Sequence, residues 1–320
     1  MSNPEARPDE VVCSAAPADE VEIMTPREVP LGGPRAMTVR RTLPQRHRSL
    51  IGAWCFLDHY GPDPVVDSGG MSVAPHPHTG LQTVSWLFTG EIEHRDSAGN
   101  QALVVPGEVN LMTAGHGISH SEISTPGTST LHGAQLWVAL PDADRETAPG
   151  FEHHAPDPVS GDGWRALVFL GSLLGSTSPV TTFTPLLGAE VVLDPGASLP
   201  VAVDPSYEHG VLVDLGSLTV CGTDVATSEL AYVPPGTGTL QLVAGDDGAR
   251  VLVLGGPPFG EAIVMWWNFV GRSHEEIEVY RKAWQDQVGE RRDGRFGVVP
   301  GELPWIPAPP LPNARLRERR

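Results

Sequence analysis

The sequence is poor in cysteine, in basic residues and in long apolar runs, and each shortage excludes a class of protein. Its three cysteines, Cys13, Cys55 and Cys221, are widely separated and odd in number, so they form neither a disulfide framework nor a C-x-x-C zinc site. No apolar run approaches the length of a membrane span, and the acidic start of the chain lacks the apolar segment of a signal peptide. We therefore expect a cytoplasmic protein with no membrane-spanning segment.

Basic residues are outnumbered: 21 Lys and Arg stand against 39 Asp and Glu, for a net charge of −18. Binding to nucleic acid or to an anionic membrane requires a basic surface, so neither is expected as a direct partner. Segments with a helical repeat are scarce, whereas glycine (36) and proline (32) are abundant. This composition predicts many short strands joined by turns, in a chain long enough for one large or two medium domains.

The chain does contain a stretch, from His76 to Glu122, with a pair of potential metal ligands at each end. His76 and His78 are two residues apart, and so are His120 and Glu122. On a β-strand this spacing places both side chains on the same face. Two such strands side by side would direct three imidazoles and one carboxylate at a common point. That donor set suits a divalent transition metal with positions left open for other molecules.

A single H-x-H triplet is weak evidence by itself. With twelve histidines in the chain, roughly half such a triplet is expected by chance, and two surface-loop histidines are the alternative for that pair alone. The second pair, about forty residues later, is harder to ascribe to chance. Between the pairs, residues 83–88 and 103–105 have the composition of strands, and residues 89–90 and 97–100 that of turns. These segments can fold one pair onto the other.

On these residues the chain resembles the pirin family of the cupin superfamily, from about residue 36 to 290. The resemblance is carried by the segments HPHTGLQTVSWLFTGEIEHRDSAGN (76–100), PGEVNLMTAGHGISHSE (106–122), VRRTLP (39–44), FLDHYGP (56–62) and WNFVGRSHEEIE (267–278). Two positions depart from the commoner pirin pattern, since Thr79 and His116 stand where many relatives have arginine. Gln82 stands where general cupins often have a glutamate ligand, a difference that is usual for pirins.

The resemblance implies an all-β fold of two cupin barrels in tandem, each a double-sheet jelly roll, with a short C-terminal helix. It also implies one Fe²⁺ per chain, with other divalent transition metals as alternatives. The implied ligands are His76, His78, His120 and Glu122. Candidates for a supporting role around the metal are Gln82, His94, Asp96 and His116. For Asp96 we place one alternative slightly ahead, a tight turn closed by its own backbone.

We expect six segments along the chain. They are a disordered acidic tail (1–35), an N-terminal cupin with the metal site (36–140), a linker (141–163), a C-terminal cupin without metal (164–260), a strand and helix packing back on the barrels (261–290) and a Pro/Arg-rich tail (291–320). In the linker, His153 and His154 are adjacent, so on an extended chain their side chains point apart. We interpret them as surface histidines.

The second half of the chain repeats the strand pattern without the metal ligands. Pro106-Gly107 recurs as Pro235-Gly236, and His78 has a counterpart near His209, at offsets of 129 and 131 residues. Offsets this similar indicate a duplicated barrel. One histidine cannot hold a metal, and no His-x-Glu pair follows Pro235-Gly236. The second barrel is therefore expected to bind none.

One helix is predicted after the second barrel. Ser273 and Glu276 form a capping box at its start, and Gly289 is a plausible stop. An apolar stripe recurs at helical spacing between them: Ile277, Tyr280, Trp284 and Val288. We expect this stripe to pack against a barrel, and the resemblance implies that the segment returns to the N-terminal domain.

The resemblance leaves two functions open. Some bacterial pirins cleave the flavonol quercetin, which implies a metal-dependent dioxygenase with a small aromatic substrate. In that case Glu122 could take the substrate's hydroxyl proton while it remains near the metal. Pirins of animal cells are associated with transcription factors, which implies a non-enzymatic, metal-dependent regulator that binds a partner protein such as a transcription factor or a metabolic enzyme. The fold alone does not decide between the two, because function depends on the site and its surroundings.

Overall fold

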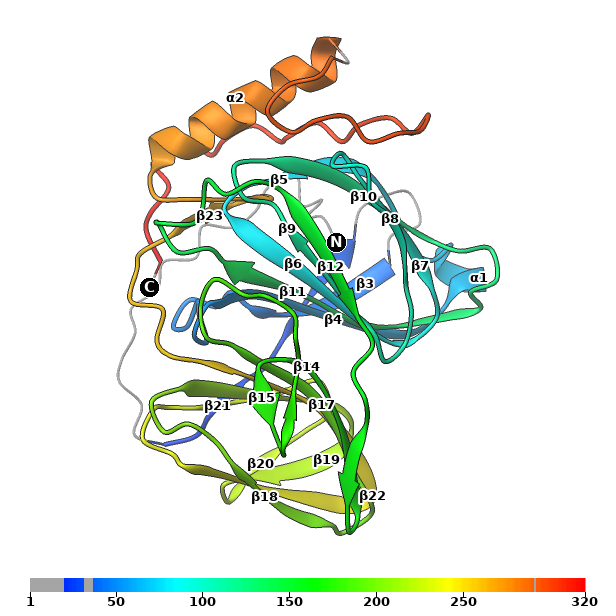
Figure 1. The fold of residues 1–320 in the computed structure, drawn as a ribbon, viewed down its shortest axis with the longest axis vertical. Helices are drawn as coiled ribbons and strands as arrows, with labels where there is room; N and C mark the ends of the chain where they lie inside the picture. Colours follow the sequence, from blue (N-terminus) through cyan, green and yellow to red (C-terminus); the bar gives the residue numbers. More distant parts are fainter. Residues whose placement is uncertain (1–19, 32–36, 291, 320) are drawn as a thin grey trace.

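The computed structural model describes residues 20–31, 37–290 and 292–319. Two β-barrels follow one another along the chain, and the helix α2 (His274–Glu290) lies against the first of them. Figure 1 shows the N-terminal barrel in the middle, the C-terminal barrel below it and α2 at the top. The predicted fold class, two cupin barrels in tandem with a C-terminal helix, is confirmed.

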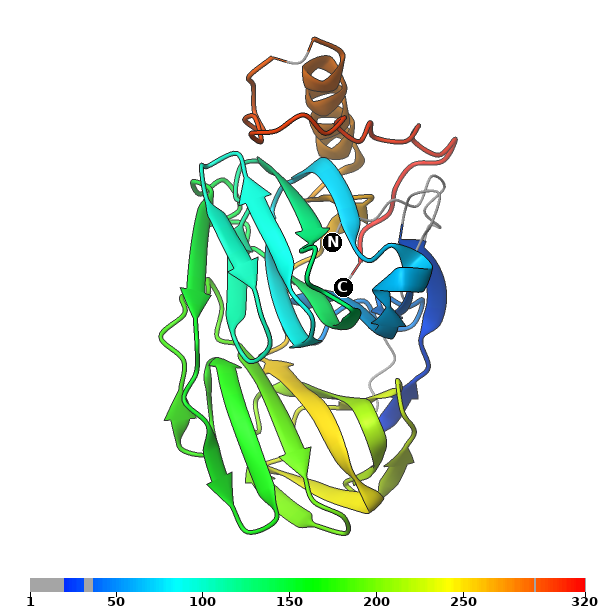
Figure 2. The same ribbon diagram turned by 90° about the vertical axis from the view of Figure 1, so that its right-hand side faces the viewer.

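The N-terminal barrel consists of two antiparallel sheets that face each other (Figure 2). The larger sheet has the strand order β12 (Gly150–His154), β9 (Val109–Thr113), β6 (Leu81–Thr89), β11 (Thr130–Ala139), β4 (Trp54–Pro64), β3 (Met37–Leu43) and β2 (Arg27–Leu31). The smaller sheet has the order β5 (Ser72–His78), β10 (Ile118–Ser124), β7 (Ile92–Asp96) and β8 (Gln101–Val104). A single helical turn, α1 (Val65–Ser68), follows β4.

The C-terminal barrel is formed by one nine-stranded sheet. Its main path is β1 (Glu22–Met24), β21 (Leu230–Val233), β19 (Glu208–Val220), β22 (Thr239–Gly256), β17 (Leu187–Leu193), β14 (Trp164–Leu170) and β13 (Val159–Gly161). Off this path, β18 (Ser198–Ala202) pairs with β22 and β20 (Thr223–Val225) pairs with β19. Strand β19 has two register shifts, and such bulges bend a strand so that it can serve both layers of a barrel. Two hairpins complete the strands: β15 (Ser172–Leu173) with β16 (Ser176–Thr177), and β23 (Val264–Trp266) with β24 (Phe269–Gly271).

The outer face of the seven-stranded sheet packs on the C-terminal barrel. Val84 and Trp86 of β6 belong to an apolar cluster that also contains Phe169 and Leu252 of the second barrel. The Trp86 and Phe169 rings stack at 4.5 Å between centroids. Because neighbouring residues of a strand point to opposite faces, Ser85 lies on the inner face. The sheet is thus buried on both sides, and only its inner side faces the interior of the first barrel.

Part of the segment predicted to be a disordered tail is ordered. Strand β1 pairs with β21 of the second barrel, and β2 pairs with β3 of the first. Met24, Val29 and Leu31 are at most 4 % exposed. These strands are short, and their alternating apolar residues are diluted by acidic and proline-rich neighbours, so the average composition concealed them. The rest of the predicted tail, residues 1–19 and 32–36, lies outside the described residues.

The predicted linker also contains two short strands. Strand β12 pairs with β9 of the first barrel, and β13 pairs with β14 of the second. The linker therefore extends one sheet of each barrel. The side chain of His153 is 43 % exposed, in line with its interpretation as a surface histidine.

Helix α2 begins at the predicted cap, where the Ser273 hydroxyl accepts a hydrogen bond from the Glu276 backbone N–H at 3.2 Å. Ile277, Tyr280 and Trp284 are buried. The buried face ends with Gln287 instead of the predicted Val288. Within the part of the chain that the structure describes, no helix is both long and apolar enough to cross a membrane.

The predicted C-terminal tail returns to the helix and to the first barrel. The Trp305 ring stacks on Trp284 at 5.4 Å, and the Trp284 indole N–H donates to the Ile306 carbonyl at 2.8 Å. The Ile306 backbone N–H in turn donates to the Pro75 carbonyl at 2.8 Å, beside the start of the H-x-H motif. Aromatic packing therefore orders a segment whose composition indicates an extended tail.

Candidate metal centre

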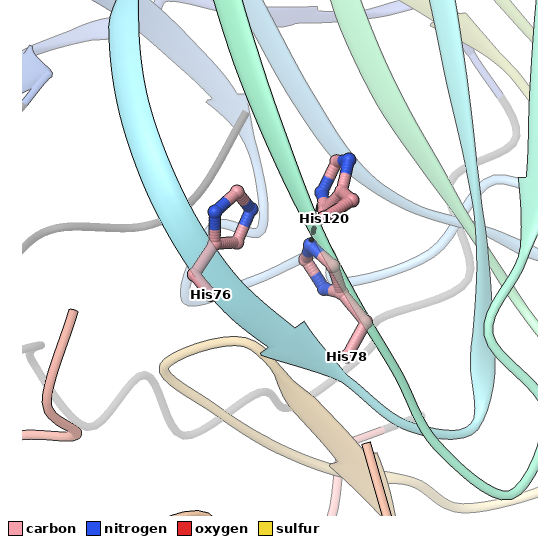
Figure 3. A group of neighbouring side chains, drawn as sticks. All are labelled: His76, His78 and His120. Atoms are coloured by element: carbon pink, nitrogen blue, oxygen red, sulfur yellow. Dashed lines mark hydrogen bonds between the residues drawn. The ribbon is translucent and has the colours of Figure 1, made fainter. Parts of the chain in front are cut away.

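The two predicted ligand pairs lie on neighbouring antiparallel strands. The register of β5 and β10 aligns His76 with His120 and His78 with Ile118. Residues directly opposite each other in such a pair have neighbouring side chains. A register shift between His120 and Glu122 then displaces the carboxylate along the strand. Figure 3 shows the three imidazoles turned toward one another from the two strands.

Hydrogen bonds determine which nitrogen of His76 and His78 carries the proton. The Nδ1 atom of His76 lies 2.9 Å from the Ala74 carbonyl oxygen, and Nδ1 of His78 lies 3.1 Å from the Asn268 carbonyl oxygen. A carbonyl can only accept, so each Nδ1 is the donor and each Nε2 keeps a lone pair. This is the tautomer that a metal ligand requires.

A chain of two side chains orients His120 in the same way. Its Nδ1 lies 3.3 Å from Nδ1 of His94, and Nε2 of His94 lies 3.3 Å from a carboxylate oxygen of Asp96. Because the carboxylate only accepts, His94 donates from Nε2 and accepts at Nδ1 from His120. The lone pair of His120 is therefore at Nε2, which lies 3.1 Å from Nε2 of His78.

Asp96 has both of the roles considered for it. Its carboxylate accepts from the backbone N–H groups of Ala98 and Asn100 at 2.9 and 3.0 Å, which closes a turn. It also accepts from His94, which contacts His120. Because the turn fixes the carboxylate, the carboxylate can fix the two imidazoles in front of it.

Burial keeps the histidines of this centre neutral. His76, His78 and His120 are fully buried, and Glu122 is 1 % exposed. Burial lowers the pKa of His76 to about 3 and holds the pKa values of His78 and His120 well below the ordinary range. Neutral imidazoles can bind a metal without first losing a proton.

The arrangement fits a metal ion. Nε2 of His76 is buried without a hydrogen-bond partner among the described residues, although buried polar atoms rarely lack one. The ligand atoms of His76, His78 and His120 lie within 4.8 Å of one another, as do those of His94, His120 and Glu122. The structure thus brings the three predicted histidines together and places Glu122 beside them, next to His120.

Other predicted residues lie elsewhere. Gln82 is aligned with Val138, on the face of the sheet that meets the second barrel, and its amide donates to the Thr113 hydroxyl at 3.0 Å. Nδ1 of His116 lies 3.1 Å from the Thr147 carbonyl oxygen. Of the four supporting residues predicted, His94 contacts the ligand His120, and Asp96 supports the site indirectly, through His94. Gln82 does not support the metal centre, because its side chain points to the opposite face of the sheet. Its position in the sequence motif does not reveal which face that is.

Thr79, the other departure from the commoner pirin pattern, is fully buried, and its hydroxyl lies 3.5 Å from the Val270 carbonyl oxygen. Val270 lies on β24, so Thr79 contacts the β23–β24 hairpin, which precedes α2 in the chain.

The opposite wall of the barrel contributes residues that the sequence analysis did not assign to the site. The Ser85 hydroxyl lies 3.4 Å from a Glu122 carboxylate oxygen. The Trp137 ring meets the His78 ring edge-on at 5.1 Å. Ser85 lies on β6, over the predicted strand 83–88, and Trp137 lies on β11. The sequence does contain a signal for Ser85: it is a polar residue between the apolar residues Val84 and Trp86 of a predicted strand, so it points to the face opposite theirs.

A second group with metal-ligand chemistry lies between the barrels. Its members are His59 of β4, His132 of β11 and Asp214 of β19, whose ligand atoms also lie within 4.8 Å of one another. Nε2 of His59 and Nε2 of His132 lie 2.7 and 2.6 Å from the same oxygen of Asp214. All three side chains are almost completely buried.

Arginines give this inter-barrel group the opposite tautomer. Arg40 lies 3.3 Å from Nδ1 of His59, and Arg250 lies 3.4 Å from Nδ1 of His132. Arginine can only donate, so both Nδ1 atoms accept and both Nε2 atoms hold protons directed at Asp214. Burial alone would raise the pKa of the Asp214 carboxyl, but the two histidine donors hold it well below its usual range. The group is a hydrogen-bonded contact between barrels, and neither imidazole directs a lone pair at its centre.

His132→Ala is therefore expected to leave the metal content unchanged and to lower stability. The substitution removes a donor from the buried Asp214 carboxylate, which costs about 1–3 kcal/mol. Elemental analysis and thermal unfolding measure the two effects separately. Loss of a metal equivalent in this variant would contradict the tautomer assignment.

The C-terminal barrel, residues 164–260, has one histidine, His209 of β19. His209 is fully buried, burial lowers its pKa to about 4, and neither ring nitrogen has a hydrogen-bond partner among the described residues. None of the metal-compatible groups in the described chain includes it.

His209→Ala should leave the metal content unchanged, as measured by elemental analysis. A second equivalent that disappears in this variant would show that the second barrel binds metal.

Two tandem cupin barrels, with a histidine centre in the first, define the class of bicupin proteins. The family models described as Pirin and Pirin C-terminal cupin domain match residues 36–138 and 188–289. A protein of Pseudomonas aeruginosa named "Putative quercetin 2,3-dioxygenase" is 46 % identical over 316 residues, 98 % of each chain. The chain belongs to the pirin family.

Two solved structures extend the comparison. The crystal structure of quercetin 2,3-dioxygenase from Acinetobacter baumannii is similar with a TM-score of 0.87 and 37 % identity, covering 93 % of this chain and 97 % of that one. Escherichia coli pirin YhhW in complex with nickel(II) has a TM-score of 0.58 at 19 % identity, covering 75 % of this chain and all of that one. The second likeness shows the shared fold alone.

Proposed function

We propose that this chain is an iron-dependent dioxygenase of quercetin-like flavonols or related aromatic compounds, with one metal ion per chain. The observation that carries the proposal is the convergence of three neutral imidazoles through Nε2, beside the buried carboxylate of Glu122. Its support is that relatives similar over nearly the whole chain have names of quercetin 2,3-dioxygenase.

The metal would be held by His76, His78, His120 and Glu122. Three nitrogens and one oxygen suit Fe²⁺ and other divalent transition metals, and zinc binds such ligands more tightly than Fe²⁺ does. When bound, the metal would supply a Lewis-acidic, redox-active centre that brings dioxygen and a substrate oxygen together.

Glu122 is the residue that would take the substrate's hydroxyl proton. Oxidation of a flavonol by dioxygen requires an electron-rich, deprotonated substrate, and a base within hydrogen-bond reach provides one. The Nδ1 protons of His76 and His78 are directed at carbonyls, so those imidazoles have no basic atom left once Nε2 is occupied. A carboxylate can bind the metal with one oxygen and accept a proton with the other. The Ser85 hydroxyl is placed to steady that carboxylate.

Aerobic incubation of the iron-loaded protein with a panel of flavonols and catechols tests the proposal. The expected result is loss of the flavonol absorbance in step with oxygen consumption, and neither change with the metal-free protein. Failure with every compound would contradict the enzyme proposal and favour a protein-binding regulator.

A further inference from the structure

The inner face of the seven-stranded sheet carries a row of polar side chains opposite the metal centre. The register aligns Asp58 of β4 with Gln135 of β11, and Gln135 with Ser85 of β6. Direct cross-strand partners share a face, so the row runs across the sheet. The Ser85 hydroxyl lies 2.9 Å from a side-chain oxygen of Gln135 and 3.4 Å from Glu122. The row therefore faces the proposed ligands.

Two aromatic residues flank this row on the same face. Tyr60 lies two residues from Asp58 on β4, and Trp137 lies two residues from Gln135 on β11, so the period of two places them on the inner side. The Trp137 ring stacks on Phe56 at 4.0 Å, and it also meets His78. Tyr60 and Trp137 are fully buried, and Gln135 is 1 % exposed.

Each of these three residues has a polar atom without a partner. The Tyr60 hydroxyl, the Trp137 indole N–H and the Gln135 amide nitrogen make no hydrogen bond within the described chain. Turning the Gln135 amide would only exchange which of its two polar atoms is unpaired. Buried polar atoms rarely lack a partner in native proteins, because the loss is costly. Three such atoms on one face near one centre indicate a partner that binds there.

The buried indoles on the outer face of the same sheet behave differently. The Trp54 indole N–H donates to backbone carbonyls of the second barrel, the nearer at 3.2 Å, and that of Trp86 donates to Glu190 at 2.7 Å. The sheet thus satisfies its buried indoles where it packs on protein. The unpaired Trp137 N–H is a property of the inner face.

The only carboxylate in the polar row is already engaged. Arg41 donates two hydrogen bonds to Asp58, at 2.7 and 2.8 Å, and both residues are buried. This closed ion pair leaves the wall with hydroxyl, indole and amide groups, of which the indole can only donate and the hydroxyl is able to donate. A molecule that satisfies these donors must bring acceptor oxygens.

We propose that Tyr60, Gln135 and Trp137 form a subsite that binds the oxygen atoms of an aromatic substrate at the metal centre. The subsite would select aromatic molecules with several hydroxyl or carbonyl oxygens over those with few, since a site built from buried donors rejects an analogue that leaves them unpaired. The inference rests on the proposed function for the identity of the substrate. It names the chemical feature by which the substrate is recognised.

Tyr60→Phe provides the most discriminating test, because its two expected effects have opposite signs. Removing a buried hydroxyl that has no partner should leave the thermal stability of the free protein unchanged or raise it. The same change should weaken quercetin binding about 2- to 10-fold, the usual value of one neutral hydrogen bond. A purely structural role for Tyr60 would instead lower stability.

Trp137→Phe has a matched control in Trp86→Phe, the same substitution on the opposite face of the sheet. Trp137→Phe should weaken quercetin binding about 2- to 10-fold while metal content stays at the wild-type value. Trp86→Phe breaks an existing hydrogen bond to Glu190, so it should lower the melting temperature and leave quercetin binding unchanged.

The measurement is an anaerobic titration of the metal-loaded protein with quercetin, and with flavone, which lacks the hydroxyl groups. Without oxygen there is no turnover, so the Kd reports binding alone. Wild-type Kd values in both Tyr60→Phe and Trp137→Phe would overturn the subsite, as would equal losses for quercetin and flavone. Binding that depends on the donors, without consumption of quercetin when oxygen is admitted, would refute the dioxygenase and keep the subsite. No binding of quercetin would contradict both.

Discussion

His120→Ala should be recovered with less than about a tenth of the metal of the wild-type protein, since loss of a mere supporting residue already weakens metal binding about 10- to 100-fold. His120 is central to the site because its Nε2 faces His78 and its strand pairs with the strand of His76. Elemental analysis for iron, zinc and nickel, after dialysis against a weak chelator, measures the loss whichever metal occupies the site. His78→Ala should behave in the same way.

His116→Ala is the matched control for that experiment. It removes a histidine of the same segment whose Nδ1 is directed at the Thr147 carbonyl oxygen. Its metal content should equal that of the wild-type protein. A full metal equivalent retained in His120→Ala would refute the ligand assignment, and loss of metal in His116→Ala would show that the assay reports general damage to the fold.

Glu122→Gln should reduce flavonol turnover about 10²- to 10⁴-fold at equal metal occupancy, the usual value of general-base assistance. Glutamine keeps the shape of the side chain and its position beside the Ser85 hydroxyl. An amide cannot take the substrate's proton at neutral pH, so the loss should appear in kcat. Turnover is measured with iron-loaded protein whose metal content has been determined for each sample.

Glu93→Gln is the control for the charge change. Glu93 lies on β7 of the same sheet, partly exposed and paired with Arg95 at 2.9 Å. Its replacement should leave turnover unchanged. Wild-type turnover in Glu122→Gln at equal occupancy would show that Glu122 acts only as a ligand.

Spacing along the chain determined the faces of the strands. His76 and His78 share a face because they are two residues apart, and the same holds for His120 and Glu122. The strand and turn segments between them made it predictable that the two pairs meet, and the structure places β5 beside β10. The predicted cap residue Ser273 similarly placed the start of α2, because a cap is a local arrangement of side chain and backbone.

Averages over a segment were a poorer guide than spacing. Residues 1–35 and 141–163 have the composition of a tail and a linker, yet β1, β2, β12 and β13 lie within them. Each of these strands is at most five residues long; β1 and β12 pair with strands distant in sequence, β21 and β9, whereas β2 and β13 pair with the next strand along the chain. Composition cannot reveal a strand partner, whether near or distant, because it averages over the order of the residues that sets the pairing.

Only the tertiary structure decided the tautomer of each buried histidine, and therefore whether its Nε2 can bind a metal. His76 and His59 are both buried, and each belongs to a group of three ligand-type residues. A carbonyl of its own strand accepts from His76 and leaves Nε2 as a lone pair, whereas Arg40 of the neighbouring strand donates to His59 and leaves Nε2 protonated. The packing of the two sheets likewise placed Tyr60, Gln135 and Trp137 on the wall that faces the metal centre. The sequence determines which way a side chain points from its strand, but what it meets there depends on which strands and barrels pack together.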